Sequence, residues 1–451
     1  MPDPAGHPAK VPLHTSPLGI WGSLKAARQN VLGLIPEAAT HAPILSGTTG
    51  KRWHMVMEPE ALRHILRARV NDYPKSMVTK LILGPAIGDS LFVAEGEHWL
   101  WQRRAAAPVF THRNVAALAP VMTLAAERSA ARIAASLGRG ADMFAEMVTA
   151  TFEVISDVTF SGGAGFDRAA VHKAIETYIG QTAKVSLLDI LGAPAWLPRP
   201  GRMVATKGIR EMKRVADAAI DQRRRDGAKP TPDLLDLLLR AEDPTSHRQM
   251  STPELRDNLL TFIVAGHETT ALTLSWALYL CAFAPDTQTE ARAEAQTALG
   301  SRAATVADLP NLPLTRRIVD EALRLYPPAA FLSRTAQASD SLLGREVRPG
   351  DTVILPIYAL HRHHALWDDP DAFNPARFAD PKAIDRFAYL PFGDGPRICI
   401  GASFALQEAV IILATLLARF KFSRIAGRDP KPVMILTLRP EGGVWLQIDP
   451  A

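Results

Sequence analysis

The chain has 451 residues, 47% of them hydrophobic, with a formal net charge of +5 and a sequence pI near 9.2. This much apolar material can fill a large core, and no stretch reads as a linker, so we expect a single domain over residues 1–451 with a short N-terminal extension, residues 1–20. The nearly balanced charge gives no reason to expect nucleic-acid binding, while a mildly basic surface suits an acidic protein partner.

The cysteine count and the N-terminus bear on localisation. Two cysteines, Cys281 and Cys399, are too few for a disulfide framework or an iron–sulfur cluster. The N-terminus lacks a charged start followed by an apolar run, so we expect neither a signal peptide nor a membrane anchor. The longest interior apolar run, Ala271–Pro285, contains Thr273 and Ser275 and is expected to be a buried helix. These features favour a cytoplasmic protein.

Helical periodicity dominates the chain, which predicts a mainly α fold with a small β region. The predicted helices are Pro59–Val70, Val115–Leu137, Met143–Phe160, Asp167–Val185, Met203–Arg225, Ser251–Phe283, Leu314–Leu325 and Ala402–Phe420. The predicted strands are Arg52–Met57, Thr352–Pro356, Val433–Leu438 and Val444–Ile448. The Pro-rich segment Ala193–Pro200 separates two helices, and we expect it to form the edge of a mobile lid.

Two polar motifs stand out on predicted helices. Trp99 and Arg103 lie one helical turn apart, so an indole N–H and a guanidinium can donate to one carboxylate, although such spacing also marks an ordinary packed face. In the long helix, small Ala265 precedes an acid–alcohol pair, Glu268 and Thr269, and the threonine hydroxyl can bond to an upstream carbonyl and open a local groove. A zinc-protease reading of His267-Glu268 fails, because the second histidine would have to be Ala271.

Farther along, Glu321 and Arg324 are three residues apart on a predicted helix, a spacing typical of surface ion pairs of little value. The run from His361 to His364 invites a metal site. However, three histidines in four residues rarely face one centre, so we expect surface or packing roles for them.

The strongest motif runs from Phe392 to Gly401 and contains Cys399. Its three glycines permit a tight turn and would let the backbone come close to a flat cofactor ring. The start of the following helix favours a thiolate, Phe392 can shield the sulfur, and Arg397 can bind an acidic group of the ring. This pattern predicts a thiolate ligand for a haem iron; the alternative is a free buried cysteine.

This segment resembles the cysteine-ligand loop of the cytochrome P450 family, and the motifs from Trp99 to Gly401 follow that family's order. The resemblance implies the P450 fold, with haem b between the long distal helix and the cysteine helix. It also implies insertion of one oxygen atom from O2 into a lipophilic organic substrate, with hydroxylation as the result.

Residue roles follow from the same resemblance. Glu268 and Thr269 relay protons to oxygen. The resemblance also implies two further sets of residues. The haem contacts are Trp99, Arg103, Ala265, Arg334, Phe392, Arg397, Cys399 and Gly401. The residues that hold the cysteine loop in place are Glu321, Arg324 and Arg377.

The substrate pocket implied by family position is apolar, with small residues near the iron. Its lining is Phe262, Ala265, Thr269, Ala329, Ala330, Phe331, Thr437 and the loop Leu81–Leu91. Fatty acids, terpenoids, steroids and aromatic compounds all remain possible substrates. The exact sequences of the motifs around Glu268 and Trp99 favour long-chain substrates.

The chain shows no nucleotide fingerprint, so electrons are expected from a ferredoxin or flavodoxin and an NAD(P)H-dependent reductase. The partner is expected to dock on the face behind Cys399. A peroxide-driven peroxygenase and a non-catalytic haem-binding sensor are the alternatives, and the presence of Glu268 and Thr269 counts against both.

Overall fold

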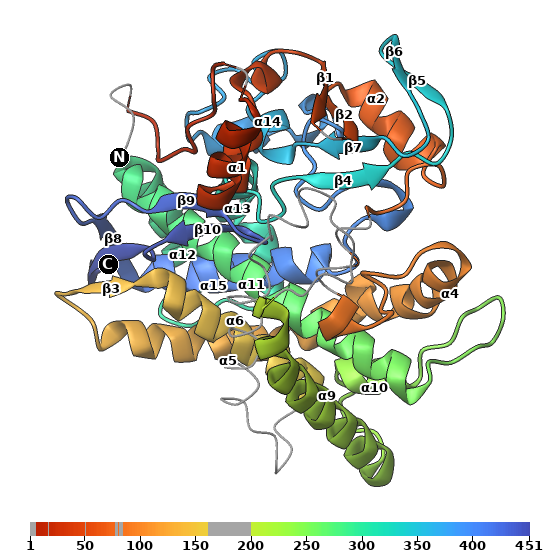
Figure 1. Cartoon of the computed structure of the whole chain (residues 1–451). Helices are drawn as coiled ribbons and strands as arrows, with labels where there is room; N and C mark the ends of the chain where they lie inside the picture. Colours follow the sequence, from red (N-terminus) through yellow and green to blue (C-terminus); the bar gives the residue numbers. More distant parts are fainter. Residues whose placement is uncertain (1–5, 17, 50, 77–79, 81–83, 161–199) are drawn as a thin grey trace. The chain divides into compact units, whose positions relative to one another are not determined.

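The structure is a computed structural model that describes residues 6–16, 18–49, 51–76, 80, 84–160 and 200–451 (Figure 1). The chain divides into two compact units. The first comprises residues 1–74, 122–150 and 269–451, and the second comprises residues 75–121 and 151–268. Three helices include the points at which the chain passes between units: α5 (His112–Ala134), α6 (Met143–Phe160) and α11 (Thr252–Phe283).

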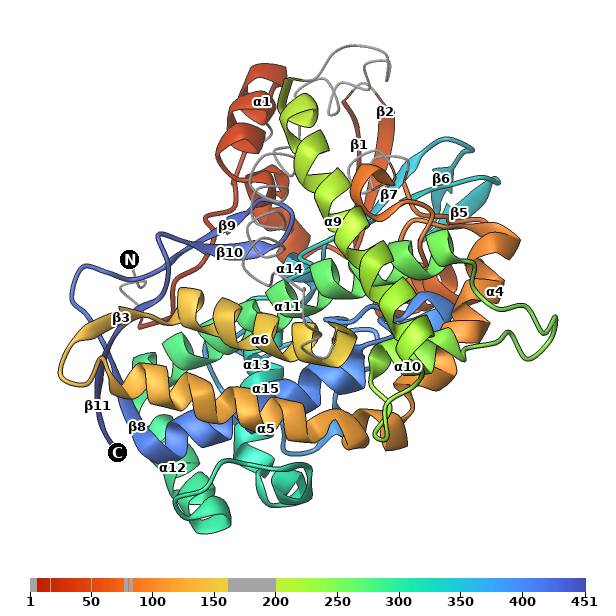
Figure 2. The same ribbon diagram turned by 90° about the horizontal axis from the view of Figure 1, so that it is seen from below.

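The core of the first unit is helical. Its helix α15 packs against α12 and α13, and residues Gln407–Ala418 of α15 are all buried (Figure 2). Helix α13 begins with Pro313, which suits the first turn of a helix, and ends before Tyr326, which precedes a proline. The α-helices of this unit are α1 (Ile20–Gln29), α2 (Pro59–Arg63), α12 (Pro285–Leu299), α13 (Pro313–Leu325), α14 (Ile357–Leu360) and α15 (Ala402–Arg419).

Short helical turns connect these helices. A π-helical turn, η3 (His64–Ala68), continues α2. The 3₁₀ turns of the first unit are η1 (Val31–Leu34), η2 (Glu37–Thr40), η5 (Val306–Asn311), η6 (Pro375–Phe378), η7 (Pro381–Ala383) and η8 (Gly395–Arg397).

The described strands all belong to the first unit. A four-stranded sheet has the order β1-β2-β7-β4, in which only the β2–β7 pair is parallel (Figure 1). A three-stranded sheet has the order β3-β11-β8, and β9–β10 and β5–β6 form antiparallel pairs. The strands are β1 (Ile44–Thr49), β2 (Lys51–Val56), β3 (Gly140–Asp142), β4 (Leu332–Thr335), β5 (Asp340–Leu342), β6 (Arg345–Val347), β7 (Thr352–Leu355), β8 (Phe420–Arg424), β9 (Lys431–Met434), β10 (Leu438–Glu441) and β11 (Trp445–Pro450).

The described helices of the second unit are joined by loops, and no described strand belongs to it. Besides its shares of α5, α6 and α11, it contains α4 (Gly96–Ala106), η4 (Ala107–Phe110), α9 (Pro200–Asp226) and α10 (Leu234–Leu239).

Most predicted elements are confirmed and one is corrected, while several elements, among them α10, β1 and β8, were not predicted. The predicted strand Val433–Leu438 is wrong, because the chain turns at residues 435–437 and forms the hairpin β9–β10. Helix α12 was not predicted, and neither was α1. The predicted helix Asp167–Val185 lies outside the described residues, and so does most of the predicted lid edge, residues 193–199.

Among the described residues, one helix is long and apolar enough to cross a membrane, and it is α15 rather than the run that begins at Ala271. Of this stretch, 72% is buried inside the protein. Such burial is typical of the core helix of a globular domain.

Candidate active site

The cysteine loop, residues Phe392–Gly401, leads directly into α15. The Cys399 N–H donates to the Phe392 carbonyl over 2.9 Å, which closes the loop, and the Cys399 residue is exposed. Gly401 is the N-cap of α15, so the thiol lies just before the positive end of a helix of 18 residues. This position favours the deprotonated thiol.

Gly395 fixes the path of this loop. Its φ is +75°, and a Cβ atom at this position would lie 2.1 Å from the Leu66 carbonyl oxygen in η3. No side chain fits there without moving a backbone. The neighbouring Asp394 accepts from Arg67 over 2.6 Å and also from Arg386. Burial alone would raise the pKa of the Asp394 carboxyl, but these two guanidinium groups outweigh it and lower the pKa.

Two further arginines of the first unit are held by backbone carbonyls. Arg397 donates through Nη1 to the carbonyls of Val70 and Tyr73, over 3.3 and 3.1 Å. Arg334 lies on β4, is 9% exposed and donates to the Ser333 carbonyl over 3.1 Å. Both side chains are therefore oriented by the main chain.

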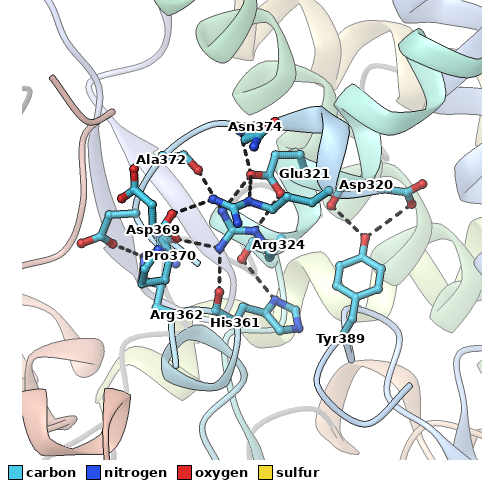
Figure 3. A network of polar contacts seen from close by, with 12 residues as sticks. Asp320, Glu321, Arg324, His361, Arg362, Asp369, Pro370, Ala372, Asn374 and Tyr389 are labelled. Atoms are coloured by element: carbon cyan, nitrogen blue, oxygen red, sulfur yellow. Dashed lines mark hydrogen bonds and ion pairs between the residues drawn. The ribbon is translucent and has the colours of Figure 1, made fainter. Parts of the chain in front are cut away.

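Glu321, Arg324 and Arg377 meet in a buried network (Figure 3). Arg324 and Glu321, both 0% exposed, form two hydrogen bonds of 2.7 and 2.8 Å, and Arg377 reaches the same carboxylate at 3.3 Å. Arg324 also donates to the carbonyls of His361, Pro370 and Ala372. The alternative of a surface ion pair is therefore wrong. Both side chains of the Glu321–Arg324 pair are fully buried, and each interacts with an opposite charge, a backbone carbonyl or both.

In the second unit, Trp99 and Arg103 both lie on α4, as predicted. The same helix is tied to its unit by neighbouring side chains. Buried Gln102 accepts from the Asn258 side chain over 2.7 Å, and Arg104 forms a two-pronged ion pair with Asp243 at 2.7 and 2.9 Å. These contacts fix the rotation of α4 about its own axis.

Helix α11 has one accessible strip. Within the continuously described stretch Asn258–Ala282, every residue is buried except Ala265, Gly266 and Thr269. These three share one face, at helical positions i, i+1 and i+4, and all are small. Glu268, beside the strip, is 4% exposed.

His267 has a structural role on this helix. Its Nδ1 bonds to the Ile263 carbonyl over 2.7 Å, and its own carbonyl accepts from the Thr151 hydroxyl of α6 over 2.9 Å. Among the described residues, no group of three or more histidine, cysteine or acidic side chains could hold a metal ion.

Comparison with known proteins assigns the family. Residues 16–447 match the family described as Cytochrome P450. The chain belongs to the cytochrome P450 family.

Several relatives span nearly all of this P450. Cyclooctatin synthase of Streptomyces melanosporofaciens is 32% identical, over 91% of this chain and 90% of that protein. Cytokinin hydroxylase of Arabidopsis thaliana is 31% identical, over 92% of this chain and 84% of that protein. The solved haem domain of cytochrome P450DA superposes with a TM-score of 0.81 at 27% identity, covering 91% of this chain and 90% of that one. The protein is therefore a P450 monooxygenase with the P450 fold and the family's haem-iron cofactor.

The residues expected to line the P450 substrate pocket are divided between the two units. Phe262 and Ala265 lie on α11 in the second unit, and Phe262 packs edge-to-face on Phe110 with ring centroids 5.1 Å apart. In the first unit, the Leu438 N–H donates to the Pro328 carbonyl over 3.1 Å. This bond brings Thr437 beside the segment Ala329–Phe331. Of the loop Leu81–Leu91, residues 84–91 are described.

Sequence reasoning missed the role of His361. This side chain is 0% exposed; its Nε2 accepts from the Leu390 N–H over 2.9 Å, and its Nδ1 bonds to the Arg324 carbonyl over 3.1 Å (Figure 3). Burial, followed by the nearby Arg324 charge, lowers the pKa of His361 to about 3, so the ring is neutral. His361 therefore joins the buried ion-pair network to the residues that precede the cysteine loop. Its place in a four-residue histidine-rich run concealed this role.

Replacing His361 by leucine tests this link. His361→Leu leaves the Leu390 N–H and the Arg324 carbonyl without their partner, and we expect a loss of about 1–3 kcal/mol of unfolding free energy at pH 7. In the parent protein, the unfolded chain binds a proton at this histidine below a pKa of about 6.5, whereas the folded one does not until the pH approaches about 3. Stability should therefore fall from pH 6.5 downward in the parent, and less steeply in the variant.

Urea unfolding at a series of pH values measures both effects. The matched control is His364→Leu, since His364 is exposed in the same run. It should keep the parental slope. Equal slopes for the parent and His361→Leu would contradict the assignment of a buried neutral ring.

Glu408 was also missed, although an acid inside the apolar run Ala402–Phe420 was a visible signal. The residue is 2% exposed on α15. Burial raises the pKa of the Glu408 carboxyl well above its usual range, and a hydrogen bond with the Thr270 side chain lowers it only in part. Burial therefore favours the protonated form of the Glu408 carboxyl in the folded protein.

Proposed function

We propose that this P450 hydroxylates a lipophilic organic substrate with O2, using haem b and electrons from a separate ferredoxin or flavodoxin served by an NAD(P)H-dependent reductase. Both compact units belong to one haem domain, which is cytoplasmic. The observation that carries the proposal is the exposed Cys399 just before α15, and the accessible strip of small residues on α11 supports it separately.

The side chains present suit a haem. Cys399 supplies one accessible thiol as the iron ligand, flanked by Phe392 and Gly401. The haem carboxylates need strong hydrogen-bond donors, and the candidates are Trp99, Arg103, Arg334 and Arg397. When bound, the haem supplies the activation of oxygen and the transfer of one oxygen atom to the substrate.

The proposed catalytic residues of the protein are Glu268 and Thr269. Oxygen activation consumes protons, and a carboxyl group beside a hydroxyl can accept a proton from water and pass it to the reacting oxygen. Thr269 belongs to the accessible strip, and the neighbouring Glu268 is largely buried. The pair therefore joins a buried side of α11 to its accessible side.

The expected substrate class rests on the apolar character of the candidate pocket. Apart from the loop Leu81–Leu91, its side chains are alanines, phenylalanines and two threonines, which offer hydrophobic contact with few polar groups. Among the relatives are a cyclooctat-9-en-7-ol 5-monooxygenase and a cytokinin hydroxylase. These names denote different substrates, so the proposal stops at the lipophilic class.

Replacing Thr269 by valine tests the proton relay. Thr269→Val keeps the side-chain shape but removes the hydroxyl, so we expect NAD(P)H to be consumed with at least about a tenfold lower yield of hydroxylated product, since a general acid–base residue contributes factors of this order or more. The remaining electrons should appear as hydrogen peroxide. The measurement is the ratio of product to NAD(P)H consumed.

Thr261→Val is the matched control, because the Thr261 hydroxyl donates to the Asp257 carbonyl within the same helix and does not belong to the accessible strip. A Thr269→Val enzyme with the parental product ratio would contradict the relay.

A ligand screen tests the function as a whole. Lipophilic compounds that displace water from the ferric haem iron change its spin state, so absorbance reports binding before any partner is known. Compounds that bind are then assayed with a ferredoxin or flavodoxin pair and with hydrogen peroxide. Faster turnover with peroxide would favour the peroxygenase alternative, and NAD(P)H consumption without product from any bound compound would favour the sensor.

A further inference from the structure

Residues His7–Val11, termed here the N-terminal strap, are built into the first unit. They form neither helix nor strand, yet Ala9 and Val11 are each only 3% exposed. Three tyrosine hydroxyls bind their main chain. The Ala9 N–H donates to Tyr279 over 3.1 Å, Tyr326 donates to the Ala9 carbonyl over 2.6 Å, and the Val11 N–H donates to Tyr358 over 2.9 Å.

The three tyrosines come from separate elements and are themselves buried. Tyr279 lies on α11, Tyr326 follows α13 and Tyr358 lies on α14, and none is more than 1% exposed. Trp276 stacks on Tyr326 with ring centroids 3.9 Å apart. A buried tyrosine hydroxyl needs a hydrogen-bond partner, and the strap provides one for each ring. The strap is therefore part of the core rather than a loose end.

Polar side chains of the strap reach a second segment, Asp368–Asn374, termed here the carbonyl loop. Lys10 Nζ lies 2.7 Å from Asp371 Oδ2, and His7 Nε2 lies 3.2 Å from Asp369 Oδ1. Asp371 also accepts from Arg362 over 3.2 Å. The strap thus binds the acidic side chains of this loop.

The same loop supplies backbone carbonyls to the buried ion-pair network (Figure 3). Arg324 donates to the carbonyls of Pro370 and Ala372, over 2.7 and 3.0 Å. Arg377 donates to those of Asp368 and Asp369. The loop therefore holds both arginines from one side, while Glu321 holds them from the other.

From this network, hydrogen bonds continue to the cysteine loop. The Arg324 carbonyl bonds to His361, and His361 accepts from the Leu390 N–H. The Gly393 N–H donates to the Leu390 carbonyl over 3.0 Å, and the Cys399 N–H donates to the Phe392 carbonyl over 2.9 Å. The path from Lys10 to Cys399 thus consists of ion pairs and hydrogen bonds joined by short main-chain steps, at Asp371 and between Phe392 and Gly393.

We propose that the N-terminal strap is a positioning element for the cysteine loop. It holds the carbonyl loop against Arg324 and Arg377, and this network in turn fixes the backbone that presents the Cys399 thiolate. The inference rests on the proposed role of Cys399 as the iron ligand. Residues 7–11, which the sequence analysis assigned to an N-terminal extension, therefore help to position the cysteine loop.

Two deletions separate positioning from general stability. Deletion of residues 2–11 removes the strap, whereas deletion of residues 2–6 leaves it in place and is the control. We expect the longer deletion to raise amide hydrogen exchange in the carbonyl loop by about tenfold or more, in haem-free protein as well as in the loaded enzyme, because local opening becomes easier. We also expect a smaller fraction of the folded, carbon-monoxide-bound enzyme to show the thiolate-type spectrum.

Point variants keep the test available if the longer deletion does not fold. Tyr326→Phe removes one hydroxyl that binds the strap, and Lys10→Met removes the ion pair with Asp371, so each should move both readouts in the same direction by a few fold. Lys10→Arg should restore the parental values. Lys25→Met changes an exposed lysine of α1 and should move neither readout.

The outcomes distinguish this inference from the proposed function. Unchanged exchange in the carbonyl loop and an unchanged thiolate fraction in the folded variants would overturn the inference. A uniform rise in exchange over the whole first unit, with an unchanged thiolate fraction, would also overturn it, because the strap would then support stability alone. If the parent protein itself did not show the thiolate-type spectrum, the role of Cys399 as iron ligand would be refuted instead.

Discussion

Cys399→Ser is expected to abolish the thiolate-type carbon monoxide spectrum while the protein still folds. A serine hydroxyl does not ionise near pH 7, so it cannot provide the anionic sulfur that the positive end of α15 favours. The Cys399 side chain lies at an exposed position before α15, so the loss of its sulfur leaves no internal cavity. The measurement is the difference spectrum of the reduced, carbon-monoxide-bound protein, together with its helical circular dichroism.

Cys281→Ala is the matched control, because Cys281 is the only other cysteine and is fully buried on α11. It should lower stability modestly, as removal of a small buried group does, and leave the spectrum unchanged. A thiolate spectrum that survives in Cys399→Ser would refute the ligand assignment.

Arg324→Met is expected to cost about 3–5 kcal/mol of unfolding free energy, the usual effect of breaking a fully buried ion pair. Arg324 and Glu321 are both 0% exposed, and Arg324 serves three carbonyls as well as the carboxylate. The variant leaves Glu321 with only part of its compensating charge. Urea unfolding measures the loss, and the haem content of the purified protein reports whether the cysteine loop keeps its form.

An ion pair on the same helix with an exposed arginine provides the comparison. Arg316 pairs with Asp320 at 2.9 Å but is 47% exposed, so Arg316→Met should change stability by at most about 1 kcal/mol and leave haem content unaltered. If the two variants lost equal stability, burial of the Glu321–Arg324 pair would not be what makes it important.

Long, periodic helices were predicted from the sequence almost to the residue. The helix Met143–Phe160 and most of Thr252–Phe283 are examples, because their apolar residues recur with the helical period. Helix α12 was missed because its buried face consists of Gln288, two alanines and a single large apolar side chain, Leu299. The hairpin β9–β10 was misread as one strand, since its turn, Ile435-Leu436-Thr437, contains neither glycine nor proline.

In the site, too, short contiguous motifs could be predicted, whereas contacts between residues far apart in the sequence could not. The cysteine loop is a contiguous motif whose chemistry is visible in ten residues. By contrast, Lys10 and Asp371 are 361 residues apart, and His361 bonds to Leu390 across 29 residues. No spacing rule reaches such pairs, because they depend on how separate elements pack. Which side chains are accessible on α11 was likewise decided by its neighbours and not by its own periodicity.

Glu408 has a practical consequence for handling and engineering the enzyme. Burial raises the pKa of its carboxyl group well above the value of about 4.3 in the unfolded chain, so the stability that Glu408 contributes is lost as the pH rises toward its folded-state pKa. His361 acts in the opposite sense, because its contribution falls as the pH drops below about 6.5. An uncharged residue at position 408, such as glutamine or methionine, is therefore a rational first substitution for extending shelf life toward alkaline buffers.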